Sequence, residues 1–373
     1  MTEMRTEIQV LRPQLPRVDA LLPYLRRIDA SRVYSNQGPL SLEFERRIAA
    51  ELRIPPGSFV SAASGTAALE AAILATAGAA SPQRPLALIP AFTFIATAAA
   101  VERCGYTPYL VDAHPATWAI DAEALQQHPK LDEVGVVVPV APFGRPLNQQ
   151  AWRAFRDRTS IPVVFDGAAS FDVSSGGDFL GEIPLALSFN ATKAFATGEG
   201  GGIASTDAEC IARVRRASNF GFFQTRECRS ESLNGKMSEY HAAVGLAELD
   251  GWVEKRAALQ SVVTRYRDAA AVEGISEQIV AHPDVSLSYV LFSALHNQEA
   301  ADVEAALQRE AIGSRRWYGF GLHNEPHYRN VEHDDLIVTD SFAARVLGIP
   351  LAPDLGERAV ARILATIGRA RST

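Results

Sequence analysis

The chain has 373 residues, of which 47% are apolar and 21% are charged. This composition is typical of a globular protein that is long enough for a large core and two domains. A net charge of −7 gives no reason to expect nucleic acid or an anionic membrane surface as a partner. No apolar run reaches the roughly 18–20 residues of a spanning helix, and the charged start lacks the apolar region of a secretory signal. We therefore expect a cytoplasmic protein.

Cysteine and lysine are both scarce. Three widely spaced cysteines without a CxxC pair favour neither a disulfide framework nor a zinc site, so we expect no metal. Only four of the 36 basic residues are lysines, at positions 130, 193, 236 and 255. Each lysine can therefore be judged by its own surroundings.

Apolar segments alternate with helical segments through the first two thirds of the chain. Helical stretches between residues 23 and 52 flank a turn at 35–39. The pattern then predicts a helix at 64–80, a strand at 86–90, a helix at 93–104, strands at 109–112 and 134–140, a helix at 149–158, and strands at 162–166 and 185–189. Continuous runs of Val, Ile and Leu between helices are typical of a parallel sheet covered on both faces. We predict a large α/β domain.

The order of elements changes after a long helical pattern at 238–271. A predicted strand at 287–294 is followed by helices at 300–310, 341–347 and 357–370. Runs of strand and then helix are typical of an α+β domain. We place the boundary inside the long helix, so that residues 1–255 form the large domain and residues 256–373 form a smaller C-terminal α+β domain.

The strand at 185–189 leads to Lys193, and four glycines follow at positions 198 and 200–202. A lysine near the end of a buried strand is costly unless its charge is used or removed. Burial lowers the pKa of a lysine, and the neutral amine can then form a Schiff base with an aldehyde cofactor. The alternative is a lysine that caps the strand and points to water.

The strand at 162–166 ends in Asp166. Ligands of open α/β sheets bind outside the carboxyl ends of the strands. A pyridoxal phosphate ring needs an acidic partner for its pyridine nitrogen, because the protonated ring acts as an electron sink. Asp166 could instead cap a following turn, but its place one strand before Lys193 favours the cofactor.

Two weaker patterns concern the phosphate and the ring of such a cofactor. Gly65 and Thr66 open a helix whose first amides could hold a phosphate, with the hydroxyl of Ser188 nearby. Hydroxyl residues also cap helices that bind nothing. Phe92 and Phe94 follow a strand, and either ring could pack against the flat ring of the cofactor, although most phenylalanines belong to the core.

In this order, the motifs resemble the DegT/StrS-type nucleotide-sugar aminotransferases, which have the aspartate-aminotransferase fold. The similarity extends over nearly the whole chain, and the block of Lys193 with its glycines is the most specific part. The matching segments are Tyr34–Pro39, Ser64–Thr66, Pro90–Phe94, Asp166, Ser188–Phe189, Thr192–Lys193, Gly198–Gly201, Asn234–Ser238 and Gly348–Leu351.

The resemblance implies a role for each matching residue. Lys193 is the catalytic lysine, which holds pyridoxal 5′-phosphate as a Schiff base and moves the proton. The residues expected to bind this cofactor are Gly65, Thr66, Phe94, Asp166, Ser188, Lys193 and Asn234, the last from the partner subunit of a homodimer with shared active sites. The residues expected to bind the sugar nucleotide are Arg316, Tyr318 and His323, whose segment is equally well interpreted as a basic surface turn.

The implied reaction transfers an amino group from glutamate to a nucleotide-linked keto sugar of the dTDP-4-keto-6-deoxyglucose type. The amino sugar could serve a surface polysaccharide, such as O-antigen lipopolysaccharide, or a natural product. Two positions depart from the family: Ala169 stands where Gln or His is frequent, and Lys236 where Arg is common.

Two alternatives remain. One is a cofactor-dependent sugar dehydratase, whose relatives replace the lysine with His, so Lys193 argues against it. The other is a non-catalytic regulator that binds pyridoxal phosphate, for which the sequence shows neither a DNA-binding appendage nor a basic patch.

Overall fold

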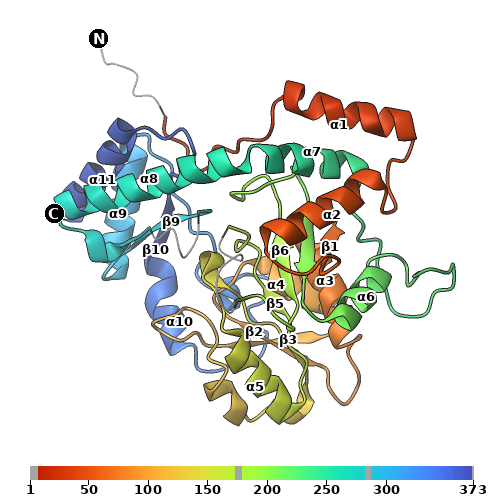
Figure 1. Cartoon of the computed structure of the whole chain (residues 1–373). Coiled ribbons are helices and arrows are strands. Elements are labelled where there is room, and N and C mark those ends of the chain that lie inside the picture. The colour runs from red at the N-terminus through yellow and green to blue at the C-terminus, as the bar shows by residue number, and fades with distance from the viewer. Residues whose placement is uncertain (1–6, 173–178, 282–286, 372–373) are drawn as a thin grey trace.

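The computed structural model describes residues 7–172, 179–281 and 287–371. Within these ranges the strands form a larger mixed sheet and a smaller antiparallel sheet (Figure 1). The strands are β1 (Phe59–Ala62), β2 (Leu86–Pro90), β3 (Thr107–Val111), β4 (Val134–Val137), β5 (Phe165–Asp166), β6 (Leu185–Ser188), β7 (Gly201–Ala204), β8 (Ile279–Val280), β9 (Val290–Ser293) and β10 (Val346–Ile349). The α-helices are α1 (Val18–Ser31), α2 (Pro39–Glu51), α3 (Gly65–Thr76), α4 (Ile95–Arg103), α5 (Gln149–Thr159), α6 (Ala208–Ala217), α7 (Glu239–Asp250), α8 (Trp252–Val272), α9 (Asn297–Arg309), α10 (Ile337–Phe342) and α11 (Glu357–Arg371).

The larger sheet is mostly parallel. β3, β2 and β4 pair in parallel, as do β5 and β6. Two single bridges, Val137 with Val163 and Val140 with Asp166, join these groups into the order β3-β2-β4-β5-β6-β7-β1. β7 runs antiparallel to both of its neighbours. The predicted parallel sheet is therefore correct except at β7, and the predicted α/β class is confirmed.

Helices cover both faces of this sheet. Val60 and Ile89 face a core shared with α3, α4 and α6. Phe59 and Leu88, each one residue earlier, face a second core shared with α2, α5 and α7. Adjacent residues of a strand point to opposite faces, so a sheet buried on both sides gives the continuous apolar runs seen in the sequence.

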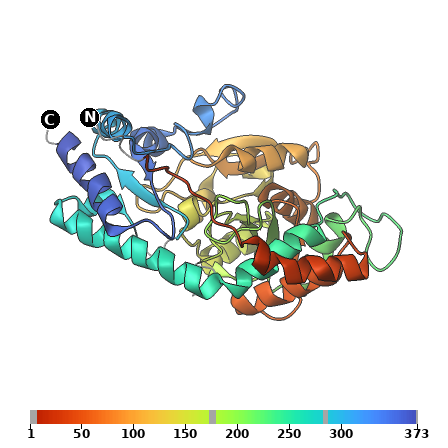
Figure 2. The ribbon, with the colours of Figure 1, turned by 90° about the horizontal axis from the view of Figure 1, so that it is seen from above.

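The long helical pattern at 238–271 is two helices that meet at Gly251. Figure 2 shows α8, in turquoise, running from α9 and α11 towards α1 and α2. Tyr266 of α8 is fully buried, and its hydroxyl donates a 2.5 Å hydrogen bond to the carbonyl of Pro350. Because α8 passes residue 255 without a break, no linker marks a boundary there, and the division at 255 stays a prediction.

The smaller sheet has the order β10-β9-β8 and is antiparallel throughout. α8, α9 and α11 pack together beside it (Figure 1). The predicted helix at 341–347 ends two residues too late: residues 341–345 are helical, but Val346 and Leu347 belong to β10, which pairs with β9. All four residues of that strand are buried, and such an apolar run cannot be told from a buried helix by periodicity alone. None of the helices in the described ranges has the length and apolar character to cross a membrane.

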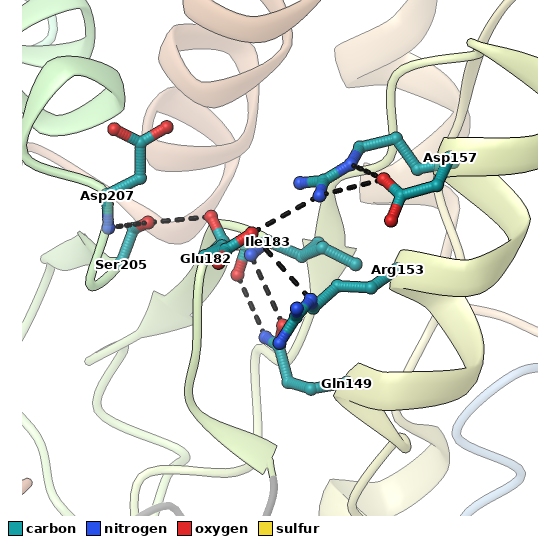
Figure 3. A network of polar contacts seen from close by, with 8 residues as sticks. Gln149, Arg153, Asp157, Glu182, Ile183, Ser205 and Asp207 are labelled. Atoms are coloured by element: carbon teal, nitrogen blue, oxygen red, sulfur yellow. Dashed lines mark hydrogen bonds and ion pairs between the residues drawn. The ribbon is translucent and has the colours of Figure 1, made fainter.

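A polar network ties α5 to the segment that enters β6 (Figure 3). The side-chain amide of Gln149 donates to the carbonyl of Ile183 at 3.0 Å and accepts from the amide of the same residue at 3.2 Å. Glu182 pairs with Arg156 at 3.2 Å, and the hydroxyl of Ser205 donates to the carbonyl of Glu182 at 2.8 Å. These contacts fix the start of the strand that leads to the predicted catalytic lysine.

Candidate active site

A cavity of about 680 Å³ lies at the carboxyl ends of β5 and β6. Most of the residues predicted from the sequence line it: Gly65, Thr66, Phe94, Asp166, Ser188, Lys193, Arg316 and Tyr318. Tyr289, which precedes β9, and Arg315 complete the side formed by the C-terminal part of the chain. The cavity is thus built from segments that lie far apart in the sequence, at the sheet edge where α/β proteins bind their ligands.

The first turn of α3 forms one wall of the cavity. Ser64 caps this helix, since its hydroxyl oxygen accepts an amide hydrogen of the first turn at 3.1 Å. A Cβ on Gly65 would lie 2.6 Å from the Cβ of Ser188, and a Cβ on Gly201 would lie 2.7 Å from the nitrogen of Gly65. Only glycine at both positions lets the helix start so close to β6 and β7. The amides of Gly65 and Thr66, at the positive end of the helix dipole, can bind an anion there.

Asp166 is buried at the end of β5. Its Oδ2 accepts a hydrogen bond from the hydroxyl of Thr97 at 2.7 Å, and its Oδ1 accepts from the amide of Ala168 at 3.1 Å. The hydroxyls of Thr97 and Thr93 lie 2.9 Å apart. Burial raises the pKa of Asp166, while the two hydrogen bonds and the positive charge of Lys193 oppose that rise. A carboxylate placed in this way can keep a facing ring nitrogen protonated.

Lys193 lies on the turn that follows β6. Its amide donates to the carbonyl of Asn190 at 2.9 Å, which closes the turn. Its Nζ donates a 2.8 Å hydrogen bond to the hydroxyl of Tyr289. The amine therefore points into the cavity, and the alternative of a lysine directed to bulk water does not describe this side chain.

The two phenylalanines after β2 differ in position. Phe94 lines the cavity and is 54% exposed, whereas Phe92 is 1% exposed. The ring of Phe92 packs against those of Phe342 and Tyr318, with centroids 4.6 and 5.1 Å apart. Phe92 is thus a core residue, and Phe94 is available to cover a flat cofactor.

The segment 315–318 contributes two arginines to the cavity, of which Arg316 forms an ion pair and Arg315 stacks on an aromatic ring. The guanidinium of Arg316 lies 2.8 Å from the carboxylate of Glu304. That of Arg315 lies over the ring of Trp317, 5.3 Å from its centroid. The hydroxyl of Tyr318 accepts a backbone amide hydrogen at 3.1 Å. A diphosphate would have to compete with Glu304 for Arg316, whereas Arg315 stacks on Trp317. We therefore favour Arg315 as the arginine that binds a diphosphate.

Asn234 and His323 are not among the residues that line the cavity of their own chain. The Oδ1 of Asn234 accepts a 2.7 Å hydrogen bond from Lys236, one of the two departures from the family pattern. The Nε2 of His323 lies 2.8 Å from Asp340. The roles of Asn234 and His323 stay predictions. Ala169, the other departure, does line the cavity.

The sequence interpretation missed three polar residues of the site. Thr97 lies in the first turn of α4, and Thr93, four residues earlier, lies just before that helix. That spacing was an available signal, since the helix is otherwise rich in alanine. Tyr289 carried no signal beyond its place in a predicted strand.

Comparisons with known proteins agree with this geometry. The family model of the DegT/DnrJ/EryC1/StrS aminotransferase family matches residues 18–368. Protein Rv3402c of Mycobacterium tuberculosis is 32% identical over 98% of this chain and 90% of its own length. The dTDP-4-amino-4,6-dideoxy-D-glucose transaminase of Escherichia coli is 27% identical over 95% of this chain and 96% of its own. The structure of a candidate PLP-dependent aminotransferase from Bacillus cereus has a TM-score of 0.87 at 29% identity and covers 97% of this chain and 100% of that chain. The predicted aminotransferase fold is confirmed.

Proposed function

Because the chain belongs to the DegT/DnrJ/EryC1/StrS aminotransferase family, we propose that it aminates a nucleotide-linked keto sugar and that Lys193 carries the cofactor. The enzyme is a sugar transaminase, and its cofactor is pyridoxal 5′-phosphate. One observation supports the assignment of residues above all others. The amine of Lys193, the carboxylate of Asp166 and the first turn of α3 line a single cavity.

The residues of the cavity fit the cofactor part by part. The amine of Lys193 can bond covalently to an aldehyde. The buried carboxylate of Asp166 suits the pyridine nitrogen, and the exposed ring of Phe94 suits a flat face. The close approach of Gly65 to Ser188 leaves a cradle that any larger side chain would fill, with amides and a hydroxyl for the phosphate. When bound, the cofactor supplies an electron sink for the carbon that loses or gains a proton.

The protein supplies position and proton transfer. The amine of Lys193 takes the proton from one carbon and returns it to another, as general base and then general acid. The charge of Asp166 keeps the ring nitrogen protonated, and Thr97 holds the carboxylate in one orientation. A ring held by Asp166 at its nitrogen and by Phe94 at its face would be fixed in orientation, and this orientation would select the bond that is broken.

We propose glutamate as the amino donor and a keto sugar of the dTDP-4-keto-6-deoxyglucose type as the acceptor. The transaminase of Escherichia coli supports the sugar, since its name specifies a dTDP-linked 4-amino-4,6-dideoxyglucose. Arg316 and Tyr318 line the cavity, and so does Arg315. A guanidinium matches the geometry of a diphosphate, so we expect the nucleotide to lie along this segment, with His323 at its far end.

A panel of dTDP- and UDP-linked keto sugars tests this function, with glutamate as donor and mass spectrometry of the products. We expect one dTDP-linked 4-keto sugar to be aminated and Lys193→Ala to be inactive. Loss of a sugar hydroxyl in place of amination would identify a dehydratase. If glutamate did not change the visible spectrum of the cofactor-loaded protein, the result would favour the non-catalytic regulator and contradict the proposal.

We further propose a homodimer whose active sites are shared. The amide group of Asn234 does not line its own cavity, and Phe94 and Ile95, 54% and 46% exposed, leave apolar surface beside that cavity. Tyr34 and Tyr240 add a stacked and exposed aromatic pair, with centroids 6.3 Å apart. In a two-fold dimer the same surface of each subunit covers that of the other. Asn234 would then reach the phosphate held by the partner subunit.

Subunit mixing tests the shared site. Lys193→Ala and Asn234→Ala should each be inactive, yet a mixed dimer carries both lesions in one site and neither in the other. Mixing and re-equilibration should restore up to about half of the normal activity per mixed dimer. Lys193→Ala mixed with Asp166→Asn is the matched control, because both residues belong to the same chain's site and no intact site can form. No recovery with Asn234→Ala, despite proven subunit exchange, would place Asn234 in its own chain's site.

A further inference from the structure

Three consecutive residues at the entry to β9 contact Asp172 and the loop that carries the catalytic lysine. The amide of Leu287 donates to the carboxylate of Asp172. The hydroxyl of Ser288 accepts from the amide that follows Lys193 at 3.2 Å. The hydroxyl of Tyr289 accepts from the Nζ of Lys193 at 2.8 Å. The bond between Ser288 and the amide of Ala194 therefore holds the residue before Tyr289 against the residue after Lys193.

The ring of Tyr289 is fixed by two aromatic neighbours. Phe143 packs against it at 5.5 Å and 77°, and Trp317 packs against it at 5.2 Å and 65°. Both contacts have the edge-to-face geometry that aromatic pairs prefer. A tyrosine side chain has only two rotatable torsions before its hydroxyl, so a clamped ring also fixes the oxygen. The phenol oxygen is thus held at the amine by packing that does not involve Lys193.

We propose that Tyr289 is a positioning residue that holds the amine of Lys193 in one orientation between proton transfers. The inference rests on the proposed role of Lys193. An ammonium donates to the phenol oxygen, as in this structure. Once Lys193 has given its proton to the reacting carbon, the phenol O–H can donate to the neutral amine. The phenol keeps its own proton throughout, and the proton returns to the nitrogen of Lys193 from the carbon of the next amino donor.

Tyr318 offers a matched comparison in the same cavity. Its ring stacks on Phe143, with centroids 4.4 Å apart, and its hydroxyl accepts from the amide of Phe143 at 3.1 Å. Tyr318→Phe therefore removes a phenol oxygen from the cavity without removing a contact of Lys193. Tyr289→Phe removes the oxygen that Lys193 contacts and keeps the ring that packs against its neighbours.

The test measures how fast the full-length protein, freed of cofactor, captures pyridoxal phosphate. The absorbance of the lysine-bound cofactor is followed across the pH range, and borohydride reduction with peptide mapping confirms the lysine. We expect Tyr289→Phe to capture the cofactor more slowly across the pH range, because the amine loses the hydrogen bond that holds it in one orientation. We also expect the half-reaction with glutamate to slow by about tenfold, with little change in KM. In Tyr318→Phe the rate of cofactor capture should stay at the wild-type value.

Two results separate this inference from the proposed function. If the cofactor maps to Lys193 and Tyr289→Phe keeps the wild-type rates of cofactor capture and of the half-reaction, the inference is overturned while the function stands. If peptide mapping places the cofactor of the wild-type protein on a residue other than Lys193, the assignment of Lys193 fails, and the inference fails with it. Tyr289→His, which keeps a ring with a polar atom, provides a second variant if Tyr289→Phe does not fold. Its rate of cofactor capture should also differ from the wild-type value, and an unchanged rate would overturn the inference.

Discussion

The hydroxyl of Thr97 donates a 2.7 Å hydrogen bond to Oδ2 of Asp166, and both side chains are buried. Burial alone would raise the pKa of this carboxyl and favour its neutral form, which cannot hold a ring nitrogen protonated. The hydrogen bond from Thr97 lowers the pKa towards its usual range. Thr97 thus acts on the cofactor through Asp166, from the start of a neighbouring helix.

Removing this hydroxyl should shift the pH dependence of the reaction. In Thr97→Val the pKa of Asp166 rises, because a donor to the ionised form is lost. Asp166 is then ionised only at higher pH, so the acidic limb of kcat/KM moves upward and activity below neutral pH falls, by about tenfold at most. Thr97→Ser keeps the donor and should follow the wild-type profile. An acidic limb of Thr97→Val that coincides with that of the wild type would contradict this role.

Asp166→Asn should keep the cofactor and lose most of the activity. An amide fills the same space but does not hold the ring nitrogen protonated, so the electron sink is weakened. We expect cofactor absorbance to persist while turnover falls by at least about a hundredfold. Turnover close to that of the wild type would make Asp166 a turn cap and nothing more.

The glycine after the catalytic loop has a steric role that can be measured. A Cβ on Gly201 would lie 2.6 Å from the carbonyl oxygen of Leu187 and 2.7 Å from the nitrogen of Gly65. Gly201→Ala should therefore cost about 1–3 kcal/mol of unfolding free energy and weaken cofactor binding, because α3 is pushed from β6. Gly251→Ala is the control: no atom lies within 4 Å of its added Cβ, and we expect about 0.4–1 kcal/mol of stabilisation. If Gly201→Ala and Gly251→Ala were equally stable in denaturant titrations, the result would contradict the close packing of α3 against β6 at Gly201.

The three thiols should differ sharply in reactivity. Cys104 and Cys210 are buried, and burial raises the pKa of both thiols, that of Cys104 to about 12. Cys228 is exposed. Since the thiolate is the reactive form, a disulfide reagent should modify Cys228 alone in the native protein and all three cysteines after unfolding. Labelling of Cys104 at the rate of Cys228 would show that the helix α3–α4 core opens readily.

Much of the large sheet could be predicted from the sequence because its strands are buried on both faces. Apolar runs such as 86–90 and 185–189 are continuous and are not interrupted by alternating polar residues, so they are easily recognised as strands. β7 was missed because it is largely glycine, and glycine carries no strand signal. α6 was missed although it is strongly amphipathic and capped by Asp207. The first two residues of β10 were taken for the end of a helix because a short apolar run fits either period.

The part of the candidate site that could be predicted consists of charged residues at the ends of buried strands, a position in which such residues have few roles besides ligand binding and catalysis. Lys193 and Asp166 stand at strand ends, where the order of the chain already implies proximity. Arg315 belongs to the segment that the resemblance already linked to the sugar nucleotide. Tyr289 was beyond such reasoning, because it reaches the cavity from a part of the chain whose packing against the large sheet no local pattern records. The pairing of Arg316 with Glu304 was equally invisible, since the two residues meet only in the folded chain.

The attachment site of the cofactor tests the central claim most directly. The protein has three other lysines, and each has a partner outside the cavity: Lys130 with Glu332, Lys236 with Asn234, and Lys255 with Glu248. Borohydride reduction of the cofactor-loaded enzyme, followed by peptide mapping, should place the pyridoxyl group on Lys193. Lys193→Ala should show no cofactor absorbance and a normal melting transition. A pyridoxyl group on Lys130, Lys236 or Lys255 of the wild-type enzyme would contradict the account.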